Sequence, residues 1–143
     1  MDEEANKIYV NIRNLNRIYC LDYPSGEVLW VMGDVGDFGQ GLFAHSHDPV
    51  FLSSHRVLVF DNGALRPEAT HDYSRIIEIE FDAAARHAAL VWEYRETPDF
   101  FCFDPGAIGI QPNRNTFATD GSNRRIFEEP QDKYKLSNLP SPP

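Results

Sequence analysis

The chain has 143 residues, 42% of them hydrophobic and 13% aromatic, which is enough for one modest domain with a packed core. Lys and Arg number 13 against 22 Asp and Glu, and the net charge of −9 argues against a broad surface for nucleic acid or anionic lipid. No apolar run approaches the roughly 20 residues of a membrane-spanning helix, and the acidic start at residues 1–4 is unlike a signal peptide. As written, the sequence predicts a soluble, unexported domain that binds neither nucleic acid nor membrane.

The first third of the chain alternates apolar and polar residues, as half-buried strands do. Three such strands are predicted, separated by short turns, at residues 7–14, 17–23 and 27–32. Short turns between strands favour an antiparallel meander. Residues 33–41 contain four glycines and no periodicity, so we expect a surface loop.

The next stretch, residues 45–63, is predicted to form a hairpin. Two apolar runs, residues 49–52 and 57–60, flank a polar break at residues 53–56. Polar residues lie at the outer ends of both strands, where proteins often place function. They are His45, His47 and Asp48 at the start, and Asp61, Asn62 and Gly63 at the end.

The remaining sequence continues in strands. Residues 73–81 and 88–95 alternate as strands, and an aromatic-rich loop that includes Phe101 follows them. A last hairpin is expected at residues 106–119, with one more strand at 124–128 and a Pro-rich tail at 137–143.

Three arginines repeat at the start of equivalent strands: Arg17, Arg75 and Arg125. Trp30 and Trp92 follow the first two at matching places. The pattern predicts an all-β protein of antiparallel four-stranded blades, about three blades of a β-propeller and hence a half-ring. The single partial-propeller domain spans residues 1–143, with blades at about 7–33, 44–96 and 104–136. The first blade lacks an inner strand, and residues 133–136 would serve as a degenerate outer strand of the third.

Motifs at ordered positions carry a resemblance to a known family. They are Asp37-Phe38, Phe43, His47-Asp48, Phe60-Asp61-Asn62-Gly63, Tyr73-Ser74-Arg75, Val91-Trp92-Glu93-Tyr94, Asn113-Arg114-Asn115-Thr116 and Arg125-Ile126-Phe127-Glu128. In this order they resemble the arylsulfotransferase (aryl-sulfate sulfotransferase-like) propeller family over roughly residues 16–128. The resemblance implies a six-bladed propeller that moves a sulfuryl group from a phenolic sulfate to a phenol through a transient sulfohistidine, without a cofactor. Members of the family are often exported, so the compartment is left open.

The resemblance also assigns residues to the expected channel. His47 matches the histidine of the H-D motif and Arg75 the arginine of Y-S-R, and these two are the predicted catalytic residues. The predicted substrate-binding residues, which would face an anionic aromatic molecule, are His45, Asp48, Asn62 and Phe101. Gly109 stands where the family commonly has Gln or His, and 143 residues supply about half of a six-bladed ring.

Simpler interpretations stand beside these. His47 and Asp48 could satisfy backbone groups at a strand entrance, and Asn62 could hold a turn. The H-x-H pair of His45 and His47 lacks further ligands at a defined spacing, so no metal site is predicted. Cys20 and Cys102 lack C-x-x-C spacing and are expected to be buried free thiols.

A second class of function is a non-catalytic half-propeller that acts as a small-molecule binding or assembly module. With either function, two copies of the chain are expected to associate and complete the ring, because propellers normally close to protect their sheet edges. The alternative is that the chain is a fragment of a longer reading frame, closed by a partner or not at all.

Overall fold

The computed structural model describes residues 6–67 and 69–130. This part of the chain contains strands, turns and one 3-10 helix, and no helix in it is long and apolar enough to cross a membrane. The elements are β1 (Lys7–Ile12), η1 (Arg13–Leu15), β2 (Arg17–Asp22), β3 (Val28–Gly33), β4 (His47–Ser53), β5 (Arg56–Asp61), β6 (Arg75–Asp82), β7 (His87–Tyr94), β8 (Ala107–Ile110), β9 (Asn115–Asp120) and β10 (Arg125–Pro130).

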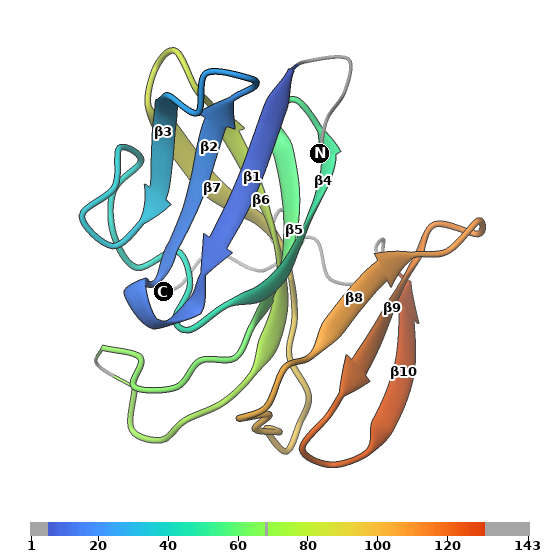
Figure 1. The fold of residues 1–143 in the computed structure, drawn as a ribbon. Helices are drawn as coiled ribbons and strands as arrows, with labels where there is room; N and C mark the ends of the chain where they lie inside the picture. The colour runs from blue at the N-terminus through green and yellow to red at the C-terminus, as the bar shows by residue number, and fades with distance from the viewer. Residues whose placement is uncertain (1–5, 68, 131–143) are drawn as a thin grey trace, which may run out of the picture.

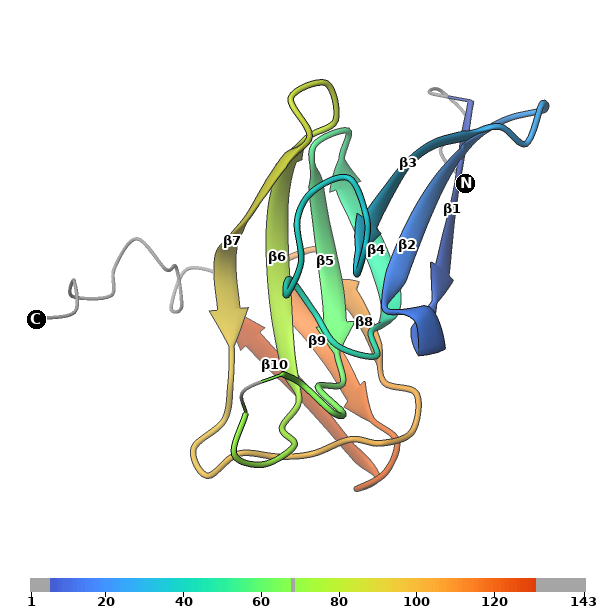
Figure 2. The ribbon, with the colours of Figure 1, turned by 90° about the vertical axis from the view of Figure 1, so that its left-hand side faces the viewer.

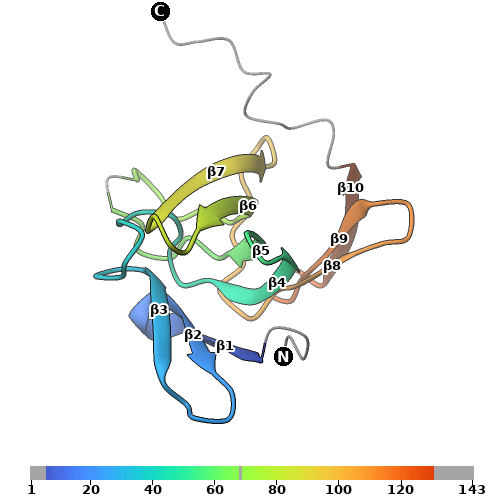
Figure 3. The same ribbon diagram turned by 90° about the horizontal axis from the view of Figure 1, so that it is seen from above.

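The strands form three antiparallel sheets, each built from consecutive strands (Figure 1). Sheet 1 has the order β1-β2-β3, sheet 2 the order β4-β5-β6-β7 and sheet 3 the order β10-β9-β8. Seen from above, sheet 2 lies between the other two (Figure 3). The all-β prediction is confirmed, and the arrangement is consistent with about three blades of a propeller that does not close.

Sheet 2 is buried on both faces because its strands are apolar at successive positions. In β5, Val57 and Val59 point toward sheet 1, whereas Leu58 and Phe60 point toward sheet 3, and all four are fully buried. Burying a side chain of this kind contributes about 1.5–3 kcal/mol. The central strands of sheet 2 therefore hold the other two sheets in place.

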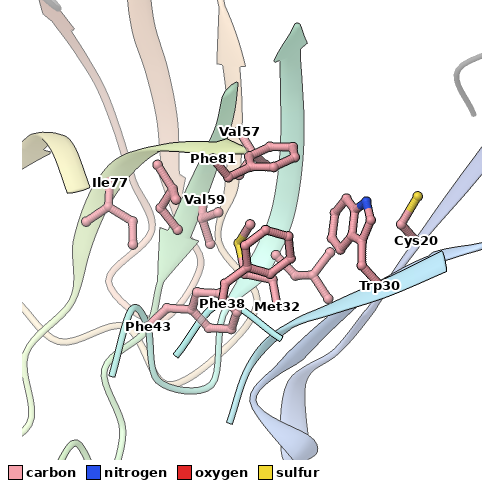
Figure 4. Close-up of a cluster of buried hydrophobic side chains, with 11 residues drawn as sticks. Cys20, Trp30, Met32, Phe38, Phe43, Val57, Val59, Ile77 and Phe81 are labelled. Atoms are coloured by element: carbon pink, nitrogen blue, oxygen red, sulfur yellow. The ribbon is translucent and has the colours of Figure 1, made fainter. Parts of the chain in front are cut away.

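Two hydrophobic cores result from this stacking. Core 1, between sheets 1 and 2, consists of Ile18, Cys20, Trp30, Met32, Phe38, Phe43, Val57, Val59, Ile77, Ile79 and Phe81 (Figure 4). Core 2, between sheets 2 and 3, consists of Leu58, Phe60, Ile76, Trp92, Tyr94, Phe100, Cys102, Ile108 and Ala118. Both cysteines are buried and free, as predicted.

The loop between β3 and β4 contributes aromatic side chains to core 1 and crosses the face of sheet 2 (Figure 2). The ring of Phe38 lies edge-on to Trp30 at 5.4 Å and to Phe81 at 5.8 Å between ring centroids. Such edge-to-face pairs add to the area that the rings bury. The glycine-rich segment is a surface loop, as predicted, and it turns the side chain of Phe38 inward to close core 1.

The predicted repeat appears in the strand register. Trp30 pairs with Cys20, which lies three residues after Arg17 in β2. Trp92 pairs with Glu78, which lies three residues after the arginine that begins β6. Both indoles are buried, as blade packing requires. The predicted outer strand at residues 133–136 and the tail at 137–143 lie outside the described residues.

One strand boundary differs from the expectation in a way that concerns function. The strand predicted to start at residue 49 begins at His47, and its register against β5 shifts between His47 and Val50. The extra residue forms a bulge, in which Asp48 has a φ of 47° and precedes a proline that cannot donate to the ladder. The bulge places the H-D motif inside the strand.

The docking of sheet 3 on sheet 2 gives a stability prediction. A Cβ atom on Gly106 would lie 2.5 Å from the Phe60 ring, whereas nothing lies within 4 Å of the same position on Gly109. Gly106→Ala is therefore expected to overpack core 2 and lower the free energy of unfolding by about 1–3 kcal/mol. Gly109→Ala should change it by no more than about 0.5 kcal/mol. Urea denaturation measures both, and equal losses would contradict the described docking.

Candidate functional site

The predicted catalytic residues lie at one end of sheet 2, where β4 begins, β5 ends and β6 begins. In the register, His47 pairs with Phe60, and Asp61 pairs with Arg75. Three motifs that are far apart in the sequence therefore meet at this end. We call this group the sheet-2 rim and define it as His47, Asp61, Asn62, Ser74 and Arg75.

His47 is fixed by an amide. Its Nδ1 lies 2.6 Å from Oδ1 of Asn62, whose side chain is fully buried. Nδ2 of Asn62 donates to the carbonyl oxygens of Cys102 at 2.7 Å and Asp104 at 3.0 Å. As the turn interpretation expected, Asn62 holds a loop, and it also connects that loop to His47.

Ser74, the middle residue of Y-S-R, joins the same network. Its Oγ donates to the carbonyl of Asn62 at 2.7 Å and accepts a hydrogen bond from the backbone N–H of Cys102 at 2.9 Å. Sequence reasoning did not single out Ser74. The hydroxyl at a strand entrance was a weak signal, since nothing in the sequence showed that the segment around Cys102 would pack there.

Asp61 is a fully buried carboxylate with several donors around it. Oδ2 accepts from Nε of Arg75 at 2.8 Å and from Nη1 of Arg66 at 3.0 Å, and Oδ1 accepts from the backbone N–H of Ala44 at 2.8 Å. A buried charge is tolerated only when it is paired and hydrogen-bonded in this way. Asp61 therefore anchors the end of β5.

Arg75 is also committed to protein partners. In addition to Asp61, it donates through Nη1 to Glu93 at 3.3 Å and through Nη2 to the carbonyl of Leu42 at 3.2 Å. Burial by itself lowers the pKa of the Arg75 guanidinium, but the charges of Asp61 and Glu93 outweigh it, so the pKa is raised. The side chain is 11% exposed, and its charge stabilises the fold by pairing with Asp61.

The same ion pair recurs in sheet 3. Asp120 at the end of β9 pairs with Arg125 at the start of β10, with 3.1 Å between Nη2 and Oδ2. In sheet 1, the position opposite Arg17 is Ile12, and Arg17 donates instead to the carbonyl of Asp34 at 2.8 Å. The repeated arginine thus pairs with an aspartate in sheets 2 and 3, which the sequence repeat alone did not show.

Two other predicted site residues flank His47. Nδ1 of His45 lies 2.8 Å from the carbonyl oxygen of Ala64, so the two histidines turn to different partners. Oδ2 of Asp48 accepts from the backbone N–H of Ile108 at 2.7 Å and so joins β4 to β8. Within the described ranges 6–67 and 69–130, no group of three or more His, Cys, Asp or Glu could hold a metal ion.

Phe101 lies in a different place from the rim. It lines a surface cavity of about 920 Å³ together with Tyr94, Arg95, Asn123 and Arg125, and His47 is not among the lining residues. Phe100 packs in core 2 and also lines this cavity, and Phe103, which is 61% exposed, lies edge-on to Phe101 at 6.4 Å between ring centroids. Phe100 and Phe101 therefore both border the cavity, whereas Phe103 is not among its lining residues.

The rim predicts a large cost for losing the carboxylate of Asp61. Asp61→Ala leaves Arg75 as a buried cation with one partner fewer, and we expect a loss of about 3–5 kcal/mol in the free energy of unfolding. The control is Glu80→Ala, which breaks the exposed pair with Arg56 and should cost about 1 kcal/mol or less. Similar urea midpoints for the two variants would show that the pair is dispensable.

Comparison with known families agrees with this geometry. The model of the family described as Arylsulfotransferase (ASST) matches residues 1–135. No curated protein matches the chain. The matched region contains all three sheets and every residue of the rim. The chain therefore belongs to the arylsulfotransferase (ASST) family.

Proposed function

We propose that this chain takes part in sulfuryl transfer from a phenolic sulfate to a phenol, with His47 as the group that carries the sulfuryl unit. The observation that supports this is the contrast in exposure within the rim. His47 is half-buried, whereas the four residues behind it are buried. The rim thus presents one imidazole from a rigid base, as a pre-organised nucleophile requires.

The proposed reaction has two steps and needs no cofactor. A nitrogen lone pair of His47 attacks sulfur, the new N–S bond forms, and the bond from sulfur to the aryl oxygen breaks as the phenolate leaves with its electron pair. The oxygen of a phenol then attacks sulfur, the N–S electrons return to the imidazole, and the phenolic proton balances the one taken up by the first phenolate. Two easier displacements replace one difficult step.

The other predicted residues receive different roles in this proposal. Arg75 and Asn62 are buried and paired, so we assign them no contact with substrate. Asn62 orients the His47 ring, and Arg75 holds Asp61, the residue before Asn62. Asp48 holds β8 against β4 through its hydrogen bond with the backbone N–H of Ile108. His45 is half-buried beside the rim and is the candidate for contact with the sulfate. Phe101 stays a prediction for aryl binding, at the separate cavity.

His47→Ala should reduce sulfuryl transfer from a chromogenic phenyl sulfate to phenol to the uncatalysed rate, because the attacking lone pair is lost. The matched control is His55→Ala, which removes an exposed imidazole from the turn between β4 and β5 at the other end of the sheet. The control should keep the rate of the unmodified protein. Transfer that survives in His47→Ala would remove His47 from the mechanism.

A second candidate function, an assembly module, is favoured by the outer faces of the end sheets. In β1, Tyr9 stacks on Phe51 at 3.6 Å between centroids, while the alternate residues Val10 and Ile12 are 37% and 38% exposed. On sheet 3, Ile126 is 69% exposed. Sheet 2 is apolar and covered on both faces, so we propose that sheet 1 of one copy packs on sheet 3 of another to complete the ring.

This assembly predicts a solution mass near twice 16.3 kDa. Val10→Lys places a charge on the outer face of sheet 1 and should shift the protein toward the monomer mass. Leu65→Lys is the control, since Leu65 is 80% exposed in the loop after β5 and its replacement should leave the mass unchanged. A clean monomer of the unmodified chain would rule out the dimer, and light scattering after size exclusion measures the mass.

A further inference from the structure

We infer that Asn62 is a positioning residue that fixes the tautomer of His47, with the proton on Nδ1 and the lone pair on Nε2. Nε2 is then the atom that bonds to sulfur. The chemical meaning of this inference rests on the proposed function, but the tautomer itself is a property of the resting protein and is measured without substrate.

The orientation of the Asn62 amide follows from its two backbone partners. Carbonyl oxygens only accept hydrogen bonds, and those of Cys102 and Asp104 lie 2.7 and 3.0 Å from the Asn62 side chain. The NH₂ group must therefore face them, since an amide turned the other way would place its own oxygen against these two carbonyl oxygens in a buried place. The amide oxygen is left to face His47.

The tautomer of His47 follows from the amide oxygen. Oδ1 has no hydrogen to donate, so the contact of 2.6 Å with Nδ1 is a hydrogen bond only if Nδ1 carries the proton. A neutral imidazole has one N–H, so its other nitrogen, Nε2, holds the lone pair. The hydrogen bond made by one ring nitrogen of a histidine sets which nitrogen carries the proton and which can react.

The Asn62 amide cannot turn to suit the other tautomer of His47, because the backbone of Asn62 and both of its chain neighbours are held in place. Its backbone carbonyl accepts from Ser74 Oγ at 2.7 Å, and its neighbour Asp61 is bound to Arg75. The next residue, Gly63, has a φ of 76°, and a side chain there would clash with the backbone of Tyr73. Turning the amide would break bonds in a fully buried site, where each unmade bond costs about 1–3 kcal/mol.

A neutral amide suits the transfer better than a carboxylate. A carboxylate in this place would stabilise the doubly protonated imidazolium, which has no lone pair. The amide carries no charge that would favour a second proton on the ring. Once sulfur is bound to Nε2 the ring carries positive charge, and the hydrogen bond from Nδ1 becomes charge-assisted and stronger. Positive charge already develops on the ring in the transition state, so Asn62 stabilises the transition state more than the ground state, which is the condition for accelerating the step.

The test is ¹⁵N NMR of the histidine side chains in the full chain at neutral pH, with the His47 signals assigned by their absence in His47→Gln. The unmodified protein should show the proton on Nδ1. Asn62→Ala should release the ring to the Nε2–H form, and Asn62→Asp should show protons on both nitrogens. Sulfuryl transfer from a phenyl sulfate should fall about 10–100-fold in Asn62→Ala, the range found when a partner that orients a metal-binding histidine is removed.

Ser122→Ala is the matched control. Ser122 Oγ accepts from the backbone N–H of Asp104 at 3.0 Å, so its loss loosens the same loop without touching His47. The control should keep the Nδ1–H tautomer. An Nε2–H tautomer in the unmodified protein overturns the inference even if Asn62→Ala does not fold, as does an unchanged tautomer in folded Asn62→Ala. If the tautomer behaves as expected but no transfer occurs, the assignment of Asn62 stands and the proposed function fails.

Discussion

The carboxylate of Asp61 is the interaction on which the site depends. It has no contact with solvent, and its donors come from three separate segments: the start of β6, the loop after β5 and the loop before β4. A buried carboxylate without such donors would cost several kcal/mol. Folding this end of sheet 2 therefore requires all three segments to arrive together. Asn62, the next residue, then has only one place to lie, and that place decides where His47 points.

The stacking of sheets and the polar rim depend on each other. Strand β5 gives alternate side chains to cores 1 and 2 and ends in Asp61 and Asn62, so any shift of its register by one residue would exchange the cores and remove both polar residues from the rim. Hydrophobic burial supplies most of the free energy that sets this register. The hydrogen bonds at the rim then specify one arrangement among those that burial alone would allow.

Local patterns predicted the strands well because alternation and turn residues are properties of short segments. The repeat of Arg17, Arg75 and Arg125 even placed the two tryptophans correctly. The partners of His47 and Asp48 were not predictable in the same way. Asn62 lies 15 positions away, at the far end of the same hairpin. Ile108 lies 60 positions away and meets Asp48 only when sheets 2 and 3 dock. Phe101 was assigned to the site by its residue type, and the structure places it at a separate cavity.

The order of the family motifs has a physical explanation in this chain. The aspartate of F-D-N-G needs the arginine of Y-S-R, the asparagine needs the serine, and the histidine of H-D needs the asparagine. The aspartate of H-D reaches across to β8 and fixes the next sheet. Each motif alone is a common short pattern, but every one of them satisfies a polar group that another leaves buried. A change in one motif therefore leaves an unpaired group in its neighbour, and the histidine is positioned only while all of them are present.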